Sequence, residues 1–172
     1  MERVFHTISP IVSPESEILI LGTMPSPKSR EFSFYYAHPQ NRFWPALALT
    51  LDEPAPTTNE EKAELILRHR LALWDVLASC DITGASDASI KNPVPNDIPS
   101  LIAASHIRRV LCTGTTSARL YTKLVFPQTK IPCEILPSPS AANARMRLED
   151  LAREYKRVLF SDGSADVSAC NH

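Results

Sequence analysis

One polar side chain in the first third of the chain is suited to hold a water molecule for hydrolysis. Asn41 lies in the string His38-Pro39-Gln40-Asn41-Arg42-Phe43-Trp44. Its amide donates and accepts hydrogen bonds but is not a useful base near pH 7. It can still place a water molecule against an electrophilic carbon by proximity and orientation. Asn41 could instead form an Asx turn or cap a helix that begins at Phe43, and such a structural role is compatible with the chemical one.

Further polar residues follow apolar runs that are typical of buried parallel strands. The first run leads into the loop Gly22-Thr23-Met24-Pro25-Ser26, and a later run, Leu71-Ala72-Leu73-Trp74, leads into Asp75. Backbone N–H groups of the glycine-led loop could stabilise negative charge on a leaving group, as could His38 if it points inward. The Asp75 carboxylate would accept a hydrogen bond from a ligand N–H group, or it would cap a helix over residues 76–80.

Alternating strands and helices would position these residues. We expect strands over residues 17–22, 71–74, 109–114 and 131–136, and helices over residues 43–49, 58–70, 96–105, 117–126 and 146–160. This order predicts an α/β fold, a three-layer α/β/α sandwich with a central, mostly parallel four-stranded sheet. Ligands of such sheets bind beyond the carboxyl ends of the strands. Three loops, residues 23–41, 75–95 and 137–143, should therefore meet at one site.

Length and composition indicate one globular domain without a metal. The 172 residues, 44% apolar and 22% charged, fit a single domain over residues 1–160, with a polar tail over residues 161–172 that we expect to fray. Neither a transmembrane run nor a signal peptide is present, so we expect a cytoplasmic protein. The four cysteines form no CxxC pair, so we expect no metal site, and the sequence suggests no cofactor.

The charge distribution favours a nucleic-acid partner more than the net charge of −1 does. Residues 101–157 hold ten basic and four acidic side chains, an excess of six positive charges. A one-sided basic half is what phosphate binding requires. The alternative is a set of solvated helix faces, because acidic and basic residues alternate over residues 149–157.

Two motifs resemble the uracil-DNA glycosylase superfamily. The first combines the loop Gly22-Thr23-Met24-Pro25-Ser26 with Tyr35-Tyr36-Ala37 and the string from His38 to Trp44. The second is Leu136-Pro137-Ser138-Pro139-Ser140, which resembles the motif that holds DNA phosphates. The similarity is greatest to the hypoxanthine-DNA (deoxyinosine) glycosylase branch. That branch is indicated by the Tyr-Tyr pair, by Trp74-Asp75-Val76-Leu77 and by the run 140–144.

The resemblance implies a role for each candidate residue. Asn41 would be the catalytic residue, because Met24 stands where related families carry an acid or amide. The base would be bound by Tyr36 through stacking, by Asp75, and by the remaining candidates Gly22, Thr23, Met24, Pro25, Ser26 and His38. DNA would be held by Ser138, Ser140, Asn143 and Arg145. The chain departs from the family in Ala141, where proline is expected, and in lacking a wedge leucine near Ser140.

The sequence therefore predicts a monofunctional DNA glycosylase. It would hydrolyse the N-glycosidic bond of a deaminated base flipped out of DNA, with hypoxanthine preferred and uracil possible, and leave an abasic site. No lysine lies inside the motifs, which disfavours a Schiff-base lyase. The alternatives are a uracil- or mismatch-specific glycosylase and a catalytically inactive DNA-binding module; an unrelated α/β hydrolase lacks support because no GxSxG motif is present. We expect a monomer whose partner is DNA containing a deaminated base.

Overall fold

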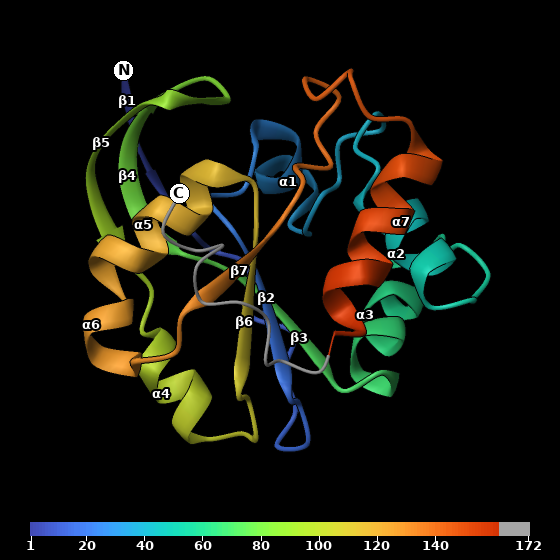
Figure 1. Ribbon diagram of the computed structural model, residues 1–172. Coiled ribbons are helices and arrows are strands. Elements are labelled where there is room, and N and C mark those ends of the chain that lie inside the picture. Colours follow the sequence, from blue (N-terminus) through green and yellow to red (C-terminus); the bar gives the residue numbers. More distant parts are fainter. Residues whose placement is uncertain (162–172) are drawn as a thin grey trace.

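A parallel sheet of four strands forms the centre of the fold, in the order β3–β2–β6–β7 (Figure 1). Its strands are β2 (Ile18–Gly22), β3 (Leu71–Asp75), β6 (Arg109–Thr113) and β7 (Cys133–Leu136). All three neighbouring pairs are parallel. The computed structural model describes residues 1–161. The predicted α/β class with a central four-stranded parallel sheet is confirmed.

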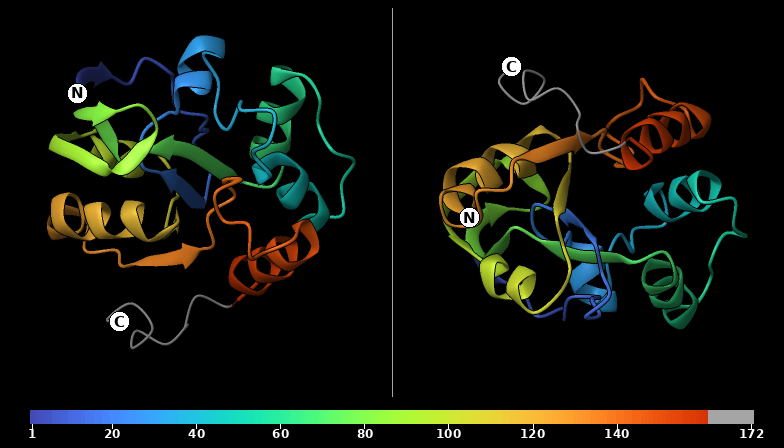
Figure 2. Two further views of the ribbon diagram at one scale, coloured as in Figure 1. Left: turned by 90° about the horizontal axis from the view of Figure 1, so that it is seen from above. Right: turned by 60° about the horizontal axis from the view of Figure 1, so that its bottom comes forward.

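Helices cover both faces of this sheet, so the sandwich has the three layers predicted (Figures 1 and 2). Three helices pack on one face: α2 (Phe43–Thr50), α3 (Asn59–Arg68) and α7 (Leu148–Leu159). The other face is covered by α4 (Ile98–Ala103), α5 (Thr115–Leu124) and the short α6 (Phe126–Thr129). A further short helix, α1 (Pro27–Phe32), follows β2 where we had expected an irregular loop.

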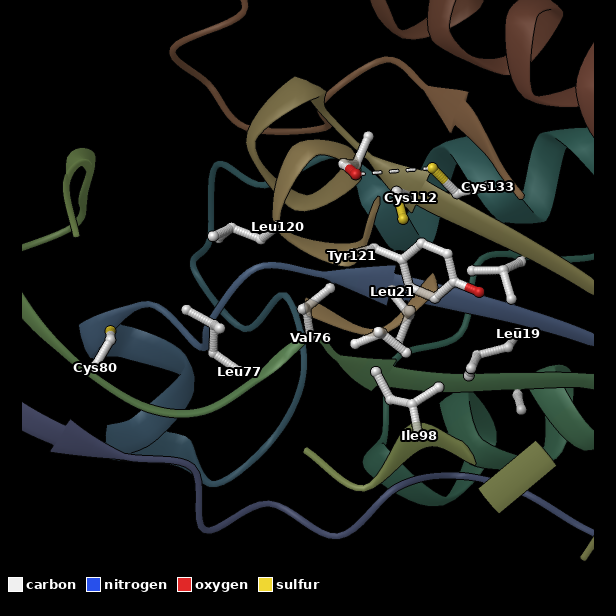
Figure 3. Close-up of a cluster of buried hydrophobic side chains, with 14 of the residues drawn as sticks. Leu19, Leu21, Val76, Leu77, Cys80, Ile98, Cys112, Leu120, Tyr121 and Cys133 are labelled. Carbon is white, nitrogen blue, oxygen red and sulfur yellow. Dashed lines mark hydrogen bonds between the residues drawn. The ribbon is translucent and has the colours of Figure 1, made fainter. Parts of the chain in front are cut away.

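Alternate residues of the strands build two separate cores. Leu19 and Leu21 point to one face, where Figure 3 shows them beside Tyr121 of α5 and Ile98 of α4. Ile20, between them in the chain, points to the opposite face and packs with the cluster that contains α2, α3 and α7. Because successive side chains of a strand point to opposite faces, one short apolar run contributes to both cores.

A second sheet, antiparallel and three-stranded, corrects the prediction for residues 75–95. It consists of β1 (Glu2–Phe5), β4 (Leu77–Thr83) and β5 (Ser86–Pro95), in the order β1–β4–β5. The alternative in which Asp75 caps a helix is wrong, because β4 begins two residues later. Strands β4 and β5 contain many small and polar residues, and β5, an irregular edge strand, also contains two prolines, Pro93 and Pro95; such residues have low strand propensity. On its other side, β4 pairs with the N-terminal strand β1, which is remote in the sequence.

Side-chain caps mark the starts of two of the predicted helices. Thr58 caps α3 by accepting a hydrogen bond from the backbone N–H of Glu61, and Asp97 caps α4 through the N–H of Ser100. The predicted helix over residues 117–126 is divided into α5 and α6. The tail predicted over residues 161–172 lies, from residue 162 onward, outside the described residues.

Candidate active site

A cavity of about 190 Å³ opens at the carboxyl edge of the parallel sheet. The strand register brings four strand ends to this edge, because Gly22 pairs with Asp75 and Thr113 pairs with Leu136. All three segments predicted to meet there contribute to the wall. The lining residues are Gly22, Thr23, Met24, Pro25, Ser26, Ser29, Tyr35, Tyr36, Asn41, Asp75, Ile82, Gly84, Ala85, Asp87, Thr113, Ser138, Pro139 and Ser140.

Asn41 lines the cavity and also forms an Asx turn with the first residue of α2. Its Oδ1 accepts a hydrogen bond of 2.9 Å from the backbone N–H of Phe43, while its own backbone N–H donates to the carbonyl of His38 at 2.9 Å. This bond is the Asx turn of the two predicted alternatives; a side-chain cap is not formed, because the N-cap position of α2 is Arg42. Because the N–H of Phe43 needs an acceptor, the bond also assigns the two ends of the amide. Oδ1 faces the helix, and the Nδ2 donor is the end left for a ligand.

Tyr36 is held rigidly on the cavity wall. Its ring stacks on Phe43, with centroids 4.0 Å apart and planes at 22°, and Phe43 is fully buried behind it. The Tyr36 hydroxyl shares a hydrogen bond of 3.0 Å with Oγ1 of Thr113. Burial and the nearby Asp75 carboxylate raise the pKa of Tyr36 well above its usual range, so the hydroxyl stays protonated. One ring face is occupied by Phe43, so only the other is available to stack on a ligand.

The Asp75 carboxylate is buried and paired with a residue that the sequence did not single out. Its Oδ2 lies 2.8 Å from Nε2 of His6, and the two side chains are only 6% and 1% exposed. His6 directly follows β1, where its backbone N–H donates to the carbonyl of Ala78 at 2.8 Å. Pairing of β1 with β4 therefore brings His6 to a residue 69 positions away.

Gly22 leaves the space that the Asp75 carboxylate occupies. A Cβ atom at position 22 would lie 2.4 Å from Oδ1 of Asp75 and 3.2 Å from the hydroxyl of Tyr36. Real Cβ atoms do not approach an oxygen so closely. The glycine is therefore needed for close packing at the strand end.

The hairpin between β4 and β5 supplies a part of the wall that the sequence did not predict. Its cavity-lining residues include Gly84, which has the left-handed φ of 57° at the turn, and Asp87. Desolvation and the Asp75 charge raise the pKa of the Asp87 carboxyl, while the nearby Thr23 side chain partly offsets this rise. The one sequence signal for this hairpin is the glycine that follows Asp81-Ile82-Thr83.

Arg42 joins the Asn41 string to the last loop. Its guanidinium donates to the carbonyls of Ser140 and Asn143, both at 3.0 Å, and to that of Met146. The backbone N–H of Arg42 donates to Pro139 at 3.0 Å. These bonds fix residues 138–146 against the start of α2, a function of the arginine that the sequence did not reveal.

The predicted DNA-binding residues of the last loop fall into two groups. Ser138 and Ser140 line the cavity, and each hydroxyl oxygen accepts a backbone N–H bond at 3.2 Å, which leaves its hydrogen free to donate. Asn143 does not line the cavity, and its Nδ2 donates to the carbonyl of Ser138 at 3.0 Å. Asn143 therefore braces the loop that presents the two serines.

Two further candidates lie outside the cavity. His38 is exposed, and its Nδ1 accepts a bond of 3.1 Å from the backbone N–H of Gln40. Arg145 is exposed on the loop that precedes α7. This placement gives no support to direct contact of His38 with a base, whereas Arg145 is accessible to a phosphate.

Part of the basic excess is used inside the protein. The guanidinium of Arg109 is buried, pairs with Glu134 at 2.8 Å and donates to carbonyls at the end of α7. On α7 itself, Arg153 pairs with Asp150, and Arg157 pairs with Glu154, each three residues apart. These pairs form the solvated helix face that we considered as the alternative to phosphate binding.

Neither a metal centre nor a membrane span is found in the described part of the chain. No group of three or more His, Cys, Asp or Glu side chains within residues 1–161 could hold a metal ion. None of the helices described here has the length and apolar character needed to cross a bilayer.

Comparison with known proteins identifies related families. The profile of the Uracil DNA glycosylase superfamily matches residues 9–162. A protein of Methanosarcina barkeri named Hypoxanthine DNA glycosylase is 31% identical over 153 residues, which cover 86% of this chain and 96% of that protein. A protein of the same name from Methanosarcina acetivorans is 32% identical over 136 residues, with coverages of 78% and 85%. The solution NMR structure of a Methanosarcina acetivorans protein, provisionally described as a uracil DNA glycosylase, superposes with a TM-score of 0.73 at 25% identity, covering 88% of this chain and 96% of that one.

Proposed function

The chain belongs to the uracil DNA glycosylase superfamily, and from this premise we propose that it excises hypoxanthine from DNA. The reaction is hydrolysis of the N-glycosidic bond of deoxyinosine, which leaves an abasic site. The similarity to two proteins named Hypoxanthine DNA glycosylase supports this choice of base. The observation that carries the proposal is that Tyr36, Asn41 and Asp75 line the same cavity.

The cavity suits a base that has been turned out of the duplex. Extrusion costs about a few kcal/mol, which contacts inside the enzyme must offset. Stacking on an aromatic ring contributes roughly 1–3 kcal/mol per base. Tyr36 offers one ring face, since Phe43 occupies the other and keeps the ring in place. Ser138 and Ser140 at the cavity rim have hydroxyl hydrogens that can donate to the phosphates beside the flipped nucleotide.

Bond cleavage requires a placed water molecule and a stabilised leaving base. In the transition state the sugar has oxocarbenium character, and the bond between C1′ and N9 breaks with its electron pair leaving on the purine. The water oxygen then bonds to C1′, and one proton from the water is released. Nδ2 of Asn41 can orient the water or donate to the departing base, and neither role needs a base at position 24.

Two carboxylates give the cavity a negative potential that favours a positively charged sugar. Asp75 is buried at the end of β3, and Asp87 lies on the hairpin beside Thr23. Their charges partly compensate for the lack of a charged or amide side chain at position 24, where this chain has Met24 and related families carry an acid or amide. Electrostatic stabilisation of developing charge is commonly the largest single contribution to catalysis.

We expect a monofunctional enzyme. The cavity lining within the described residues contains no lysine, so no Schiff base with the sugar is expected. Repair of DNA implies an intracellular protein, and a monomer suits an enzyme that must surround a duplex.

Uracil is the second candidate substrate, because its N3–H donor beside a carbonyl can also be read by Asp75. Purified protein would be incubated with labelled oligonucleotides that carry one deoxyinosine, deoxyuridine or deoxyadenosine. Each oligonucleotide is tested single-stranded and opposite each base, and alkali then cuts the abasic sites. Asn41→Ala is compared with Gln40→Ala, a matched control at an exposed position of the same string.

The expected result is cleavage at deoxyinosine that Asn41→Ala slows by about 10²- to 10³-fold and Gln40→Ala leaves unchanged. Faster cleavage at deoxyuridine would move the protein to the uracil-excising group. Absence of cleavage at either base, with the DNA still bound, would refute the proposed function and leave an inactive DNA-binding protein.

A further inference from the structure

The pair formed by His6 and Asp75 is an element of the cavity wall that lies partly outside the family match. The matched region begins at residue 9, so it includes Asp75 but not His6. The imidazole lies between two aromatic side chains, with ring centroids 6.0 Å from Tyr35 and 6.5 Å from Trp74. A side chain only 1% exposed, in contact with a carboxylate on the cavity wall, is placed to control that carboxylate.

The backbone fixes which nitrogen of His6 carries the hydrogen. The N–H of Ile8 points at Nδ1 of His6 at 3.3 Å, so Nδ1 is the acceptor. The hydrogen is therefore on Nε2, which donates to Oδ2 of Asp75 at 2.8 Å. The hydrogen bond that Nδ1 accepts from Ile8 therefore determines that Nε2 is the donor to the Asp75 carboxylate.

This arrangement leaves Oδ1 of Asp75 as the free acceptor. Oδ1 lies over Gly22, 2.4 Å from the point that a Cβ atom of residue 22 would occupy, and the Tyr36 hydroxyl lies 3.2 Å from the same point. Nδ2 of Asn41 is the free donor on the same cavity wall, since Oδ1 of that residue is bound to Phe43. An acceptor and a donor match a lactam edge, in which a ring N–H stands next to a carbonyl. Adenine has the opposite pattern, a ring nitrogen that accepts and an amino group that donates.

We propose that His6 is a positioning residue that holds Asp75 as a fixed acceptor for the ring N–H of a lactam base. The pair thereby selects hypoxanthine over the adenine from which deamination produces it. This inference rests on the proposed function, because it assigns a reading role at the same cavity.

The proposal predicts how an amide at position 75 would be oriented. In Asp75→Asn, the Nε2–H of His6 requires Oδ1 of the asparagine as its acceptor, so Nδ2 turns toward the ligand. Two donors, Nδ2 and the ring N–H of hypoxanthine, then face each other. If position 6 is glutamine, whose amide can either donate or accept, the asparagine is free to turn its oxygen to the base.

The test is a double-mutant cycle with free hypoxanthine and free adenine as probes. Isothermal titration calorimetry on wild type, His6→Gln, Asp75→Asn and the double variant measures base affinity without requiring hydrolysis. We expect Asp75→Asn to weaken hypoxanthine binding by about 10- to 100-fold, as loss of a hydrogen bond to a charged group does. His6→Gln should weaken it by less than about tenfold, and the double variant should bind at least about tenfold more tightly than Asp75→Asn.

Several outcomes would overturn the inference. The double variant could bind hypoxanthine no more tightly than Asp75→Asn, or the effects of the two changes on affinity could be additive. The wild-type protein could also bind adenine as tightly as hypoxanthine. Circular dichroism checks that each variant is folded. If His6→Gln does not fold, ¹⁵N-resolved NMR of wild-type His6 decides, since a hydrogen on Nδ1 would contradict the proposed arrangement.

The same proteins separate this inference from the proposed function. If the wild-type protein excises deoxyinosine but the double variant does not recover hypoxanthine affinity, only the role of His6 is refuted. Wild type that binds hypoxanthine with the expected variant pattern, but excises nothing, refutes only the proposed function.

Discussion

Two substitutions at Asn41 separate its structural role from its chemical one. Asn41→Asp keeps an oxygen that can accept the 2.9 Å bond from the N–H of Phe43, and it removes the Nδ2 donor. Asn41→Ala removes both. If the amide donor acts in catalysis and the oxygen holds the first N–H group of α2, the aspartate variant should be stable but inactive, and the alanine variant should be less stable and inactive.

The size of each effect follows from the contacts. Loss of the hydrogen bond from the Phe43 N–H to the Asn41 side chain costs about 1 kcal/mol of stability. In a protein of this size, such a loss lowers the melting temperature by about 2–4 °C. Asn41→Asp should be at least as stable as wild type, since a carboxylate near a helix N-terminus stabilises the helix by about 0.3–1 kcal/mol. Removal of one oriented donor from an active site typically lowers the rate by about 10²- to 10³-fold, which we expect for both variants.

The assay combines thermal unfolding by circular dichroism with single-turnover excision of deoxyinosine from a labelled duplex. Single-turnover conditions measure bond cleavage rather than product release. Activity of Asn41→Asp within a few-fold of wild type would show that the donor is not needed. An unchanged melting temperature in Asn41→Ala would show that the bond to Phe43 does not stabilise α2.

Three further predictions concern the surroundings of the cavity. Gly22→Ala should destabilise the protein by about 1–3 kcal/mol in urea unfolding and weaken hypoxanthine binding, because the new Cβ would lie 2.4 Å from the Asp75 carboxylate; unchanged stability would contradict this contact. Arg42→Met should increase hydrogen exchange over residues 138–146 and weaken DNA binding, while free hypoxanthine binds as before, because the guanidinium anchors three carbonyls of that loop; equal exchange in both proteins would refute the anchoring role. Excision should be unaffected by EDTA, since the described residues offer no group of metal ligands, and loss of activity restored by a divalent cation would contradict a metal-free mechanism.

The central sheet of the fold can be predicted from local sequence patterns. Apolar runs closed by Gly22 and Asp75 predict buried parallel strands, and the threonine and aspartate caps of α3 and α4 mark the helix starts. These features are readable because burial on both faces requires an uninterrupted apolar run, and because a cap needs one residue type at one position. The same reasoning places the Asn41 string at the carboxyl edge of the sheet.

The antiparallel sheet was not readable in this way. Strands β4 and β5 contain small and polar residues, and Pro93 and Pro95 lie in β5. Local propensity disfavours strands there, and the pairing of β4 with β1, more than seventy residues earlier in the chain, overrides it. The hairpin wall and Asp87 could therefore not be assigned to the cavity from the sequence.

The sequence by itself determined which residue types could do chemistry, and the tertiary structure decided how their atoms are presented. It indicated Asn41, Tyr36 and Asp75, because each lies in a recognisable motif or directly after a strand. Only the folded chain shows that Phe43 occupies the oxygen of Asn41 and that His6 occupies one oxygen of Asp75. The orientation of an amide or carboxylate depends on the hydrogen-bond partner that reaches it, and for Asp75 that partner comes from a strand remote in sequence.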